Sequence, residues 1–190
     1  MEQNNDEYFE YLNQRSSLGL IYRKNFLYPR LAREMQGKVL DVGCGIGDFL
    51  EFYKNAKGTD INIKNVEYCS KIGLEVSFME NGVIPHNDES FESAVLDNVL
   101  EHVEDPKFLL SEINRILCKK GLLIIGVPGF KGYESDSDHK IFYEEELLKK
   151  TLSKNNFNLK KFFYMPLFKS IFLSKIIRQY CIYGVFIKNN

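Results

Sequence analysis

The stretch KVLDVGCGIGDFL, residues 38–50, organises the rest of the chain. It opens with a short apolar run around one carboxylate, Asp41, which is typical of a buried strand over residues 39–42. Three alternating glycines follow and indicate a tight turn into a helix that begins near Asp48. Glycines at the tip of a parallel strand let the backbone approach a ligand, because no Cβ is in the way. The stretch is therefore predicted to be a ligand-binding loop.

The spacing and charge of this loop distinguish between possible cofactors. A dinucleotide loop has the form G-x-G-x-x-G, whose last glycine packs the helix so that its N-terminus can receive a pyrophosphate. Here the spacing is G-x-G-x-G, with Asp41 before it and Asp48 after it. Carboxylates repel a phosphate and attract a cation. S-adenosylmethionine, which carries a sulfonium, an ammonium and no phosphate, therefore fits the loop better. A glycine turn without a ligand is the alternative.

These residues resemble the first motif of the class I S-adenosylmethionine-dependent methyltransferases, L-D-x-G-x-G-x-G. The resemblance covers residues 37–130 by specific motifs and the remainder by layout. It implies a Rossmann-like α/β fold: a seven-stranded, mostly parallel sheet with helices on both faces and an antiparallel last strand. Strands are predicted at 39–42, 56–60, 74–79, before 97, at 122–127, 159–164 and 180–188. Helices are predicted at 7–34 with a break near 28–29, from 48, and at 66–72, 107–117, 144–154 and 168–178.

Further cofactor contacts are predicted where the next strands end. Asp60 lies 19 positions after Asp41, where the second strand of a βαβ unit ends. A carboxylate there can accept both ribose hydroxyls, and a helix N-cap is the alternative role. In the resembling family, an acidic residue ahead of a Leu/Ile-Pro pair sits near the adenine; Glu80 takes that place, with a plain turn residue as the alternative. The predicted cofactor-binding residues are Asp41, Gly43, Gly45, Gly47, Asp60, Ile61, Glu80 and Asp97.

The residues after the fourth predicted strand are candidates for the chemistry. Asn98, Glu101 and His102 stand at i, i+3 and i+4, which would place them on one side of a helical turn. A histidine with a pKa near neutrality can take a proton from a hydroxyl. His102 is therefore the first candidate for a general base, and Glu101 and His139 are the other catalytic candidates.

The Glu101-His102 pair also resembles the E-x-x-E-H metal signature of ubiquinone-pathway O-methyltransferases and small-RNA 2′-O-methyltransferases. Asn98 stands at the first position, so this chain has one charge fewer. The resemblance implies a divalent ion, Mg²⁺ or Mn²⁺ and less readily Zn²⁺, on Asn98, Glu101, His102 and His139. A metal-free pocket lined by the histidine is the alternative.

Substrate contacts are predicted from two segments. Residues 1–36 are expected to form a helical extension that acts as a lid, ahead of an S-adenosylmethionine-binding domain over residues 37–190. Residues 129–140 form a polar loop after the fifth strand, a usual place for acceptor recognition. Packing and helix capping are the alternative roles. The predicted substrate contacts are Tyr11, Arg15, Tyr22, Arg23 and Tyr133.

Composition restricts the partners. The 190 residues carry a net charge of −1, which argues against a nucleic-acid partner. Residues 147–190 hold nine Lys or Arg and no Asp or Glu, which indicates a solvated basic face or an anionic substrate. Four cysteines without a C-x-x-C pair and a polar N-terminus predict the reducing cytoplasm. The apolar segment 166–187 is interrupted by Lys169, Lys175 and Arg178, so no membrane span is expected.

These observations predict a cytoplasmic methyltransferase that uses S-adenosylmethionine and acts on a small molecule, most readily at a hydroxyl. By resemblance, enzymes of this layout modify sugars or other precursors of bacterial surface polysaccharides, and the basic tail is compatible with a phosphorylated acceptor. An RNA 2′-O-methyltransferase and a catalytically silent cofactor-binding module are the two alternatives. The sequence predicts no oligomeric state.

Overall fold

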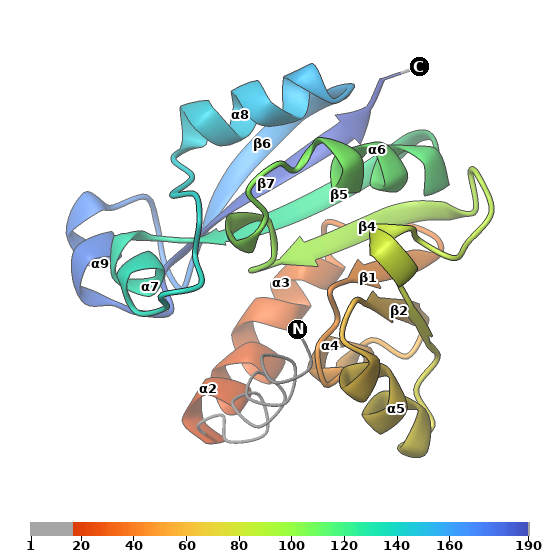
Figure 1. The fold of residues 1–190 in the computed structure, drawn as a ribbon. Helices are drawn as coiled ribbons and strands as arrows, with labels where there is room; N and C mark the ends of the chain where they lie inside the picture. Colours follow the sequence, from red (N-terminus) through yellow and green to blue (C-terminus); the bar gives the residue numbers. More distant parts are fainter. Residues whose placement is uncertain (1–16, 190) are drawn as a thin grey trace.

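The computed structural model describes residues 17–189 and is built on one seven-stranded sheet (Figure 1). The strand order is β3-β2-β1-β4-β5-β7-β6. Strands β1 to β5 pair in parallel, whereas β7 runs antiparallel to both β5 and β6. The predicted fold class is therefore confirmed. The strands are β1 (Val39–Val42), β2 (Ala56–Asp60), β3 (Val76–Phe78), β4 (Phe91–Asp97), β5 (Leu117–Pro128), β6 (Phe157–Met165) and β7 (Cys181–Lys188).

Helices cover both faces of this sheet (Figure 1). Two buried clusters define the layers: one packs α6 and α8 onto the sheet, and the other packs α3 and α4 onto the opposite face. The helices are α2 (Ser17–Tyr22), the π-helix η1 (Arg23–Leu27), α3 (Tyr28–Ala32), α4 (Asp48–Phe52), α5 (Ile63–Lys71), the 3₁₀ turns η2 (Glu80–Gly82) and η3 (Leu100–His102), α6 (Lys107–Ile116), α7 (Phe130–Glu134), α8 (Glu145–Lys154) and α9 (Ile171–Ile176).

The central strands are apolar because both of their faces are covered. Leu123, Ile124 and Ile125 in β5 alternate between the two clusters, and each is fully buried. Burial of such a side chain contributes about 1.5–3 kcal/mol. A continuous apolar run is the expected pattern for a parallel strand with helices on both sides. Residues 122–127 therefore place β5 inside the sheet between β4 and β7, and the carboxyl ends of β4, β1 and β2 follow one another along the same edge.

The N-terminal helix corrects one prediction. A break was expected near Tyr28-Pro29, but the backbone stays helical from Ser17 to Ala32. Proline is tolerated there because Pro29 lies in the first turn of α3, where its missing N–H is not required. Leu27, Tyr28 and Leu31 are buried against the sheet. The proposed division of the chain at residue 36 stays a prediction.

Two further boundaries differ from the sequence interpretation. Strand β5 begins at Leu117 and not at residue 122, because Leu117 pairs with Phe91 and the register then shifts, so that the next partners are Ser93 and Leu122. The segment 129–140, expected to be a loop, contains the short helix α7. Within residues 17–189, no helix combines the length and the apolar character that crossing a bilayer would require.

Candidate active site

The glycine loop after β1 has the tight turn that its sequence predicts. Gly43, Gly45 and Gly47 have φ angles of 75°, 55° and 82°, a left-handed region that favours glycine. A Cβ at Gly43 would lie 2.6 Å from Val99, and one at Gly47 would overlap Leu74. Both the backbone conformation and the packing therefore require glycine, and the loop carries the chain from β1 into α4.

Asp60 fastens this loop to the end of β2. Its Oδ2 accepts a hydrogen bond from the Gly45 N–H at 2.8 Å, and its Oδ1 accepts one from the Asn62 N–H at 2.8 Å. Asn62, and not Asp60, caps α5, since its side chain accepts from the Lys64 N–H. The alternative role of Asp60 as a helix N-cap is therefore wrong.

The ends of β1, β2 and β4 bring three carboxylates together. Burial raises the pKa of Asp41 well above its usual value, and the charges of Asp97 and Asp60 raise it further. Burial also raises the pKa of Asp60, although its bonds from Asn62 and Gly45 oppose the shift. Such shifts mean that negative charge is disfavoured here in the absence of a cation. The edge is thus suited to a positively charged ligand.

Asp97 is held by residues from both ends of the chain. Its Oδ2 accepts from Arg23 Nη1 at 3.1 Å, and its Oδ1 accepts from the Tyr183 hydroxyl at 2.6 Å and from Asn98 Nδ2 at 2.9 Å. Gly126 has no Cβ that would collide with the Asp97 carboxylate and the Tyr183 ring. Arg23, predicted to contact substrate, therefore lies beside a predicted cofactor residue and fixes the N-terminal helix over the sheet edge.

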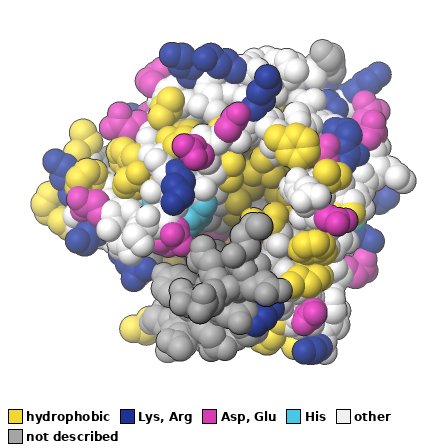
Figure 2. Space-filling view, in the orientation of Figure 1, with side chains coloured by type: hydrophobic (Ala, Val, Ile, Leu, Met, Phe, Trp, Pro, Cys, Tyr) yellow, Lys and Arg dark blue, Asp and Glu magenta, His cyan; other side chains and the backbone are white. Residues whose placement is uncertain are grey.

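Glu101, His102 and His139 form the second group of polar side chains. Each offers a ligand atom, and these atoms lie within 4.8 Å of one another. The Glu101 side chain is fully buried, and neither of its oxygens has a hydrogen-bond partner among the described residues. Burial raises the pKa of Glu101 to about 8, with added contributions from the charges of Asp97 and Asp136. Figure 2 shows a histidine side chain at the edge of a hollow in the centre of this face.

The two histidines are oriented by their neighbours. His139 Nδ1 lies 2.8 Å from the Tyr133 carbonyl oxygen, and the two rings stack with centroids 5.3 Å apart. With Nδ1–H donating to that carbonyl, Nε2 carries the free lone pair and faces Glu101 Oε1 at 3.8 Å. The His102 ring lies 4.6 Å from the His139 ring. Burial, followed by the nearby His139, lowers the pKa of His102, so that it is a neutral base at pH 7.

Asn98 does not join this group through a helical turn. The expected i, i+3, i+4 arrangement is wrong, because Asn98 has φ of 55° and the 3₁₀ turn η3 contains only Leu100–His102. The Asn98 amide donates to Asp97, and its carbonyl accepts a weak contact from Cys181 Sγ at 3.6 Å. The group of possible metal ligands in the structure therefore consists of one carboxylate and two imidazoles.

The other predicted site residues are more scattered. Tyr133 lies against the histidines, as described, and Tyr22 has a buried hydroxyl without a hydrogen-bond partner among residues 17–189. Ile61 directly follows β2, and Glu80 directly follows Met79. Both side chains are exposed. Tyr11 and Arg15 lie outside the described residues. Sequence reasoning missed Tyr183, since its partner Asp97 is 86 positions away and no local motif marks it.

Comparison with known proteins identifies the class to which this site belongs. Residues 40–125 match the family model described as "Methyltransferase domain". An uncharacterized protein of Methanocaldococcus jannaschii is 30% identical over 115 residues, which cover 58% of this chain and 56% of that relative. A ubiquinone/menaquinone biosynthesis C-methyltransferase of Citrifermentans bemidjiense is 29% identical over 135 residues, which cover 62% of this chain and 57% of that enzyme. The chain thus spans little more than half the length of these curated relatives.

The fold itself recurs in a solved structure from Thermotoga maritima. That protein is an S-adenosylmethionine-dependent methyltransferase described as a possible histamine N-methyltransferase, with a TM-score of 0.70 and 21% identity over 96% of this chain and 98% of that one. The same class of protein is indicated by the glycine loop, by the carboxylates at the strand ends, by the strand order and by these matches. The chain belongs to the class I S-adenosylmethionine-dependent methyltransferases.

Proposed function

We propose that this chain transfers a methyl group from S-adenosylmethionine to a hydroxyl of a small molecule. The bound cofactor supplies an electrophilic methyl group on sulfur, whose leaving group is a neutral thioether. The chain's residues must then hold the donor and acceptor in line and remove the acceptor proton. The observation that carries the proposal is the buried, unpartnered Glu101 beside two histidines, within the same edge of the sheet as the glycine loop.

The charge at the strand ends supports S-adenosylmethionine as the ligand. Burial raises the pKa of both Asp41 and Asp60, and for Asp41 the charges of Asp97 and Asp60 raise it further. A sulfonium and an ammonium would stabilise the charged form of these groups, whereas a phosphate would add to the repulsion. Arg23 is paired with Asp97. We therefore assign the positive end of the cofactor to this edge and its ribose to Asp60.

Removal of the acceptor proton is assigned to His102. Its lowered pKa leaves the ring neutral at pH 7, so a ring nitrogen can take the hydroxyl proton during the transfer. Tyr133 stacks on His139 and borders the same group, so it is the aromatic residue best placed to orient the acceptor. The basic segment 147–190 supports an anionic acceptor such as a phosphorylated or nucleotide-linked sugar, and hence a role in surface polysaccharide synthesis.

We also propose that Glu101, His102 and His139 hold a divalent ion. Their donor atoms are close together, and the Glu101 oxygens lack other partners. Two imidazoles and one carboxylate suit Mn²⁺ or Zn²⁺ better than Mg²⁺, which prefers oxygen ligands. With an ion bound, the lone pair of His102 would be taken up by the metal, so the ion and not His102 would assist proton loss, by polarising the acceptor hydroxyl and lowering its pKa. The four free cysteines support a reducing, cytoplasmic setting for the enzyme.

The test of the reaction is release of S-adenosylhomocysteine from the purified chain with a panel of sugars, phosphosugars, quinols and amines. We expect turnover with a hydroxyl acceptor, and an O-methyl signal in the product by mass spectrometry and NMR. Substitution His102→Ala is expected to lower turnover by about 10²–10⁴-fold, while His86→Ala, a histidine that packs on Phe91 at the opposite end of β4, serves as the control. A product methylated on carbon or nitrogen would contradict the oxygen assignment. Salt-sensitive binding of short RNAs in a gel shift would favour the RNA alternative.

The metal is tested without the reaction. Titration of Mn²⁺ into the chain, followed by electron paramagnetic resonance and calorimetry, is expected to show one site that is lost in Glu101→Gln. The exposed Glu104→Gln on the same turn is the matched control and is expected to bind as the parent does. Equal affinity in both variants, or no binding in the parent, would refute the metal site and leave His102 as a metal-free base.

A further inference from the structure

The short helix α9 and its flanking turns carry an unusual concentration of exposed apolar side chains. Isolated exposed apolar residues are common, whereas a contiguous group usually marks an interaction surface. Here five exposed large apolar residues fall within ten positions of the chain, and Phe130 of the adjoining α7 is a sixth. We name this surface the α7–α9 lobe; its apolar residues are Phe130, Leu167, Phe168, Ile171, Phe172 and Ile176, with exposed fractions from 40% to 75%.

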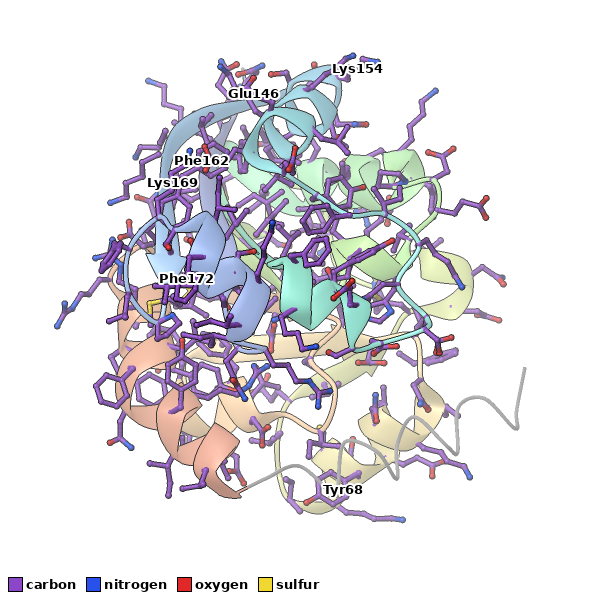
Figure 3. All side chains as sticks on the ribbon, turned by 90° about the vertical axis from the view of Figure 1, so that its left-hand side faces the viewer. Tyr68, Glu146, Lys154, Phe162, Lys169 and Phe172 are labelled. Carbon is purple, nitrogen blue, oxygen red and sulfur yellow. The ribbon has the colours of Figure 1, made fainter. Side chains whose placement is uncertain are left out.

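The lobe projects from one end of the molecule. In Figure 1 α7 and α9 lie together at the left-hand side, and in Figure 3, which looks onto that side, α9 faces the viewer with Phe172 labelled on it. Figure 2 shows apolar side chains over the same region, with dark blue cations and magenta carboxylates among them. The lobe is therefore an outer face of the described structure and lies away from the sheet core.

Hydrogen bonds fix α9 with its apolar side outward. The Ser170 side chain caps the helix by accepting from the Leu173 N–H, and the Ser174 hydroxyl accepts from the Phe130 N–H at 2.8 Å. The Tyr180 hydroxyl accepts from the Ser170 N–H and donates to the Phe168 carbonyl. The inward side of α9 is thus occupied by polar anchors. Collapse of the apolar side chains onto the protein would break these bonds, so the exposed face is built into the segment.

Cations border this apolar face. Lys175 lies one helical turn after Ile171, on the same side of α9, and it is exposed. Lys131 in α7 is exposed as well, and Lys169 and Arg178 are exposed cations that already have partners, Lys169 being paired with Glu145 at 2.7 Å. Within α7 and α9, Lys131 and Lys175 stand against one acidic residue, Glu134, and the acidic residues just beyond α7, Asp136 and Asp138, lie near His102. Apolar side chains surrounded by Lys and Arg are the combination that binds the interface of an anionic bilayer.

A second copy of the chain is a poorer occupant. A two-fold interface places the same patch on both subunits, so that a surface rich in cations meets a second surface rich in cations. The Lys and Arg around the lobe would then repel, whereas lipid phosphates would attract them. A free anion would leave the apolar side chains in water. The combination of apolar side chains and cations on the lobe therefore favours a partner surface that is both apolar and negatively charged.

We propose that the α7–α9 lobe docks this chain onto the surface of an anionic lipid bilayer. The apolar side chains would enter the boundary between headgroups and acyl chains, to a depth of about 5–10 Å, and the cations would contact lipid phosphates. Docking does not depend on the proposed reaction. If that reaction is correct, docking also has a consequence for the acceptor: α7 carries Tyr133, so the entrance to the site would be held near the membrane surface.

Vesicle binding by the full chain tests the proposal. The protein is mixed with vesicles of phosphatidylcholine alone or with phosphatidylglycerol, and bound protein is measured by sedimentation. We expect binding to the phosphatidylglycerol vesicles that weakens as salt is raised. The triple variant F168S/I171S/F172S is expected to bind at least about tenfold more weakly, since three apolar side chains no longer insert. The control I72S/F108S removes two exposed apolar residues elsewhere and is expected to bind as the parent does.

The absence of tryptophan from the sequence allows a direct second measurement. Phe172→Trp places a single reporter on the lobe, and Phe108→Trp places one on α6. With phosphatidylglycerol vesicles we expect a blue shift and protection from a soluble quencher for the first reporter only. Equal behaviour of the two reporters, or unchanged vesicle binding by the triple variant, would overturn the proposal. A concentration-dependent dimer in the parent that the triple variant lacks, without vesicle binding, would reassign the lobe to self-association.

Discussion

Replacing Glu101 by glutamine is expected to stabilise the metal-free protein, and to do so increasingly as the pH rises. Burial raises the pKa of this carboxyl from 4.5 to about 8 in the folded protein. A carboxyl whose folded-state pKa is raised stays protonated at no cost below its unfolded pKa. Above that value, the carboxyl must either take up a proton when the chain folds or be buried as an ion. The free energy of unfolding therefore falls progressively between pH 4.5 and pH 8. An amide of the same shape has no such cost.

The size of the effect follows from the shift. One pKa unit corresponds to about 1.4 kcal/mol, so the full shift corresponds to about 5 kcal/mol above pH 8. Relaxation and water entry reduce the cost of burying a charge in real proteins. We therefore expect the stability advantage of Glu101→Gln over the parent to grow by about 2–4 kcal/mol between pH 5 and pH 8.5. Groups common to both proteins, such as His102 and Asp41, cancel in this difference.

The measurement is urea unfolding of both proteins at pH 5 and pH 8.5 in the presence of a chelator. Glu104→Gln, which removes an exposed carboxylate from the same turn, controls for the loss of one charge. An advantage that is equal at the two pH values, or that shrinks as the pH rises, would refute the account of Glu101 as a buried carboxyl without a partner. Addition of Mn²⁺ at pH 8.5 should stabilise the parent and leave Glu101→Gln unchanged.

Three further substitutions separate binding, chemistry and packing. Asp60→Ala should weaken S-adenosylmethionine binding by about a hundredfold in calorimetry, since two charge-assisted hydrogen bonds are lost. His102→Ala should lower kcat by about 10²–10⁴-fold with little change in cofactor affinity; an unchanged kcat would remove it from the chemistry. Gly47→Ala should cost about 2–4 kcal/mol in urea unfolding, because φ is positive and the new Cβ would overlap Leu74. Gly73→Ala, with equal φ but open space, should cost about half as much.

The core of the fold could be predicted because its signals are local. The run of residues 38–50 combines a buried strand, left-handed glycines and a helix start within thirteen positions, and Asp60 follows at the distance that a βαβ unit requires. The parts of the fold that the sequence did not predict depend on pairing between residues that are far apart in the chain. Lys119-Lys120-Gly121 has the composition of a helix end, yet it belongs to an irregular part of β5 that forms because Leu117 pairs with Phe91. That register depends on how two strands pair, so the sequence of one strand alone does not predict it.

The same distinction separates the predicted and the missed parts of the site. Glu101 and His102 are adjacent in sequence, and their place after β4 follows from the strand pattern. The position of Asn98 does not, because helical spacing assumes helical φ, whereas Asn98 adopts a positive φ that asparagine tolerates better than most residues. Helix α7 is also set by a remote contact, since its Phe130 N–H bonds to Ser174, 44 positions later. Five residues are too few for a periodic pattern to show.

The electrostatics of the strand ends connect the two halves of the site. Asp41, Asp60 and Asp97 come from three parallel strands, and the topology alone places their carboxylates at one edge. Folding therefore brings like charges together, and the pKa of Asp41, raised first by burial, is raised further by that repulsion. Arg23, in the π-helix η1, offsets part of it through its ion pair with Asp97. The remaining negative charge favours a cationic ligand, so the same repulsion that destabilises the free protein contributes to selecting a sulfonium over a phosphate.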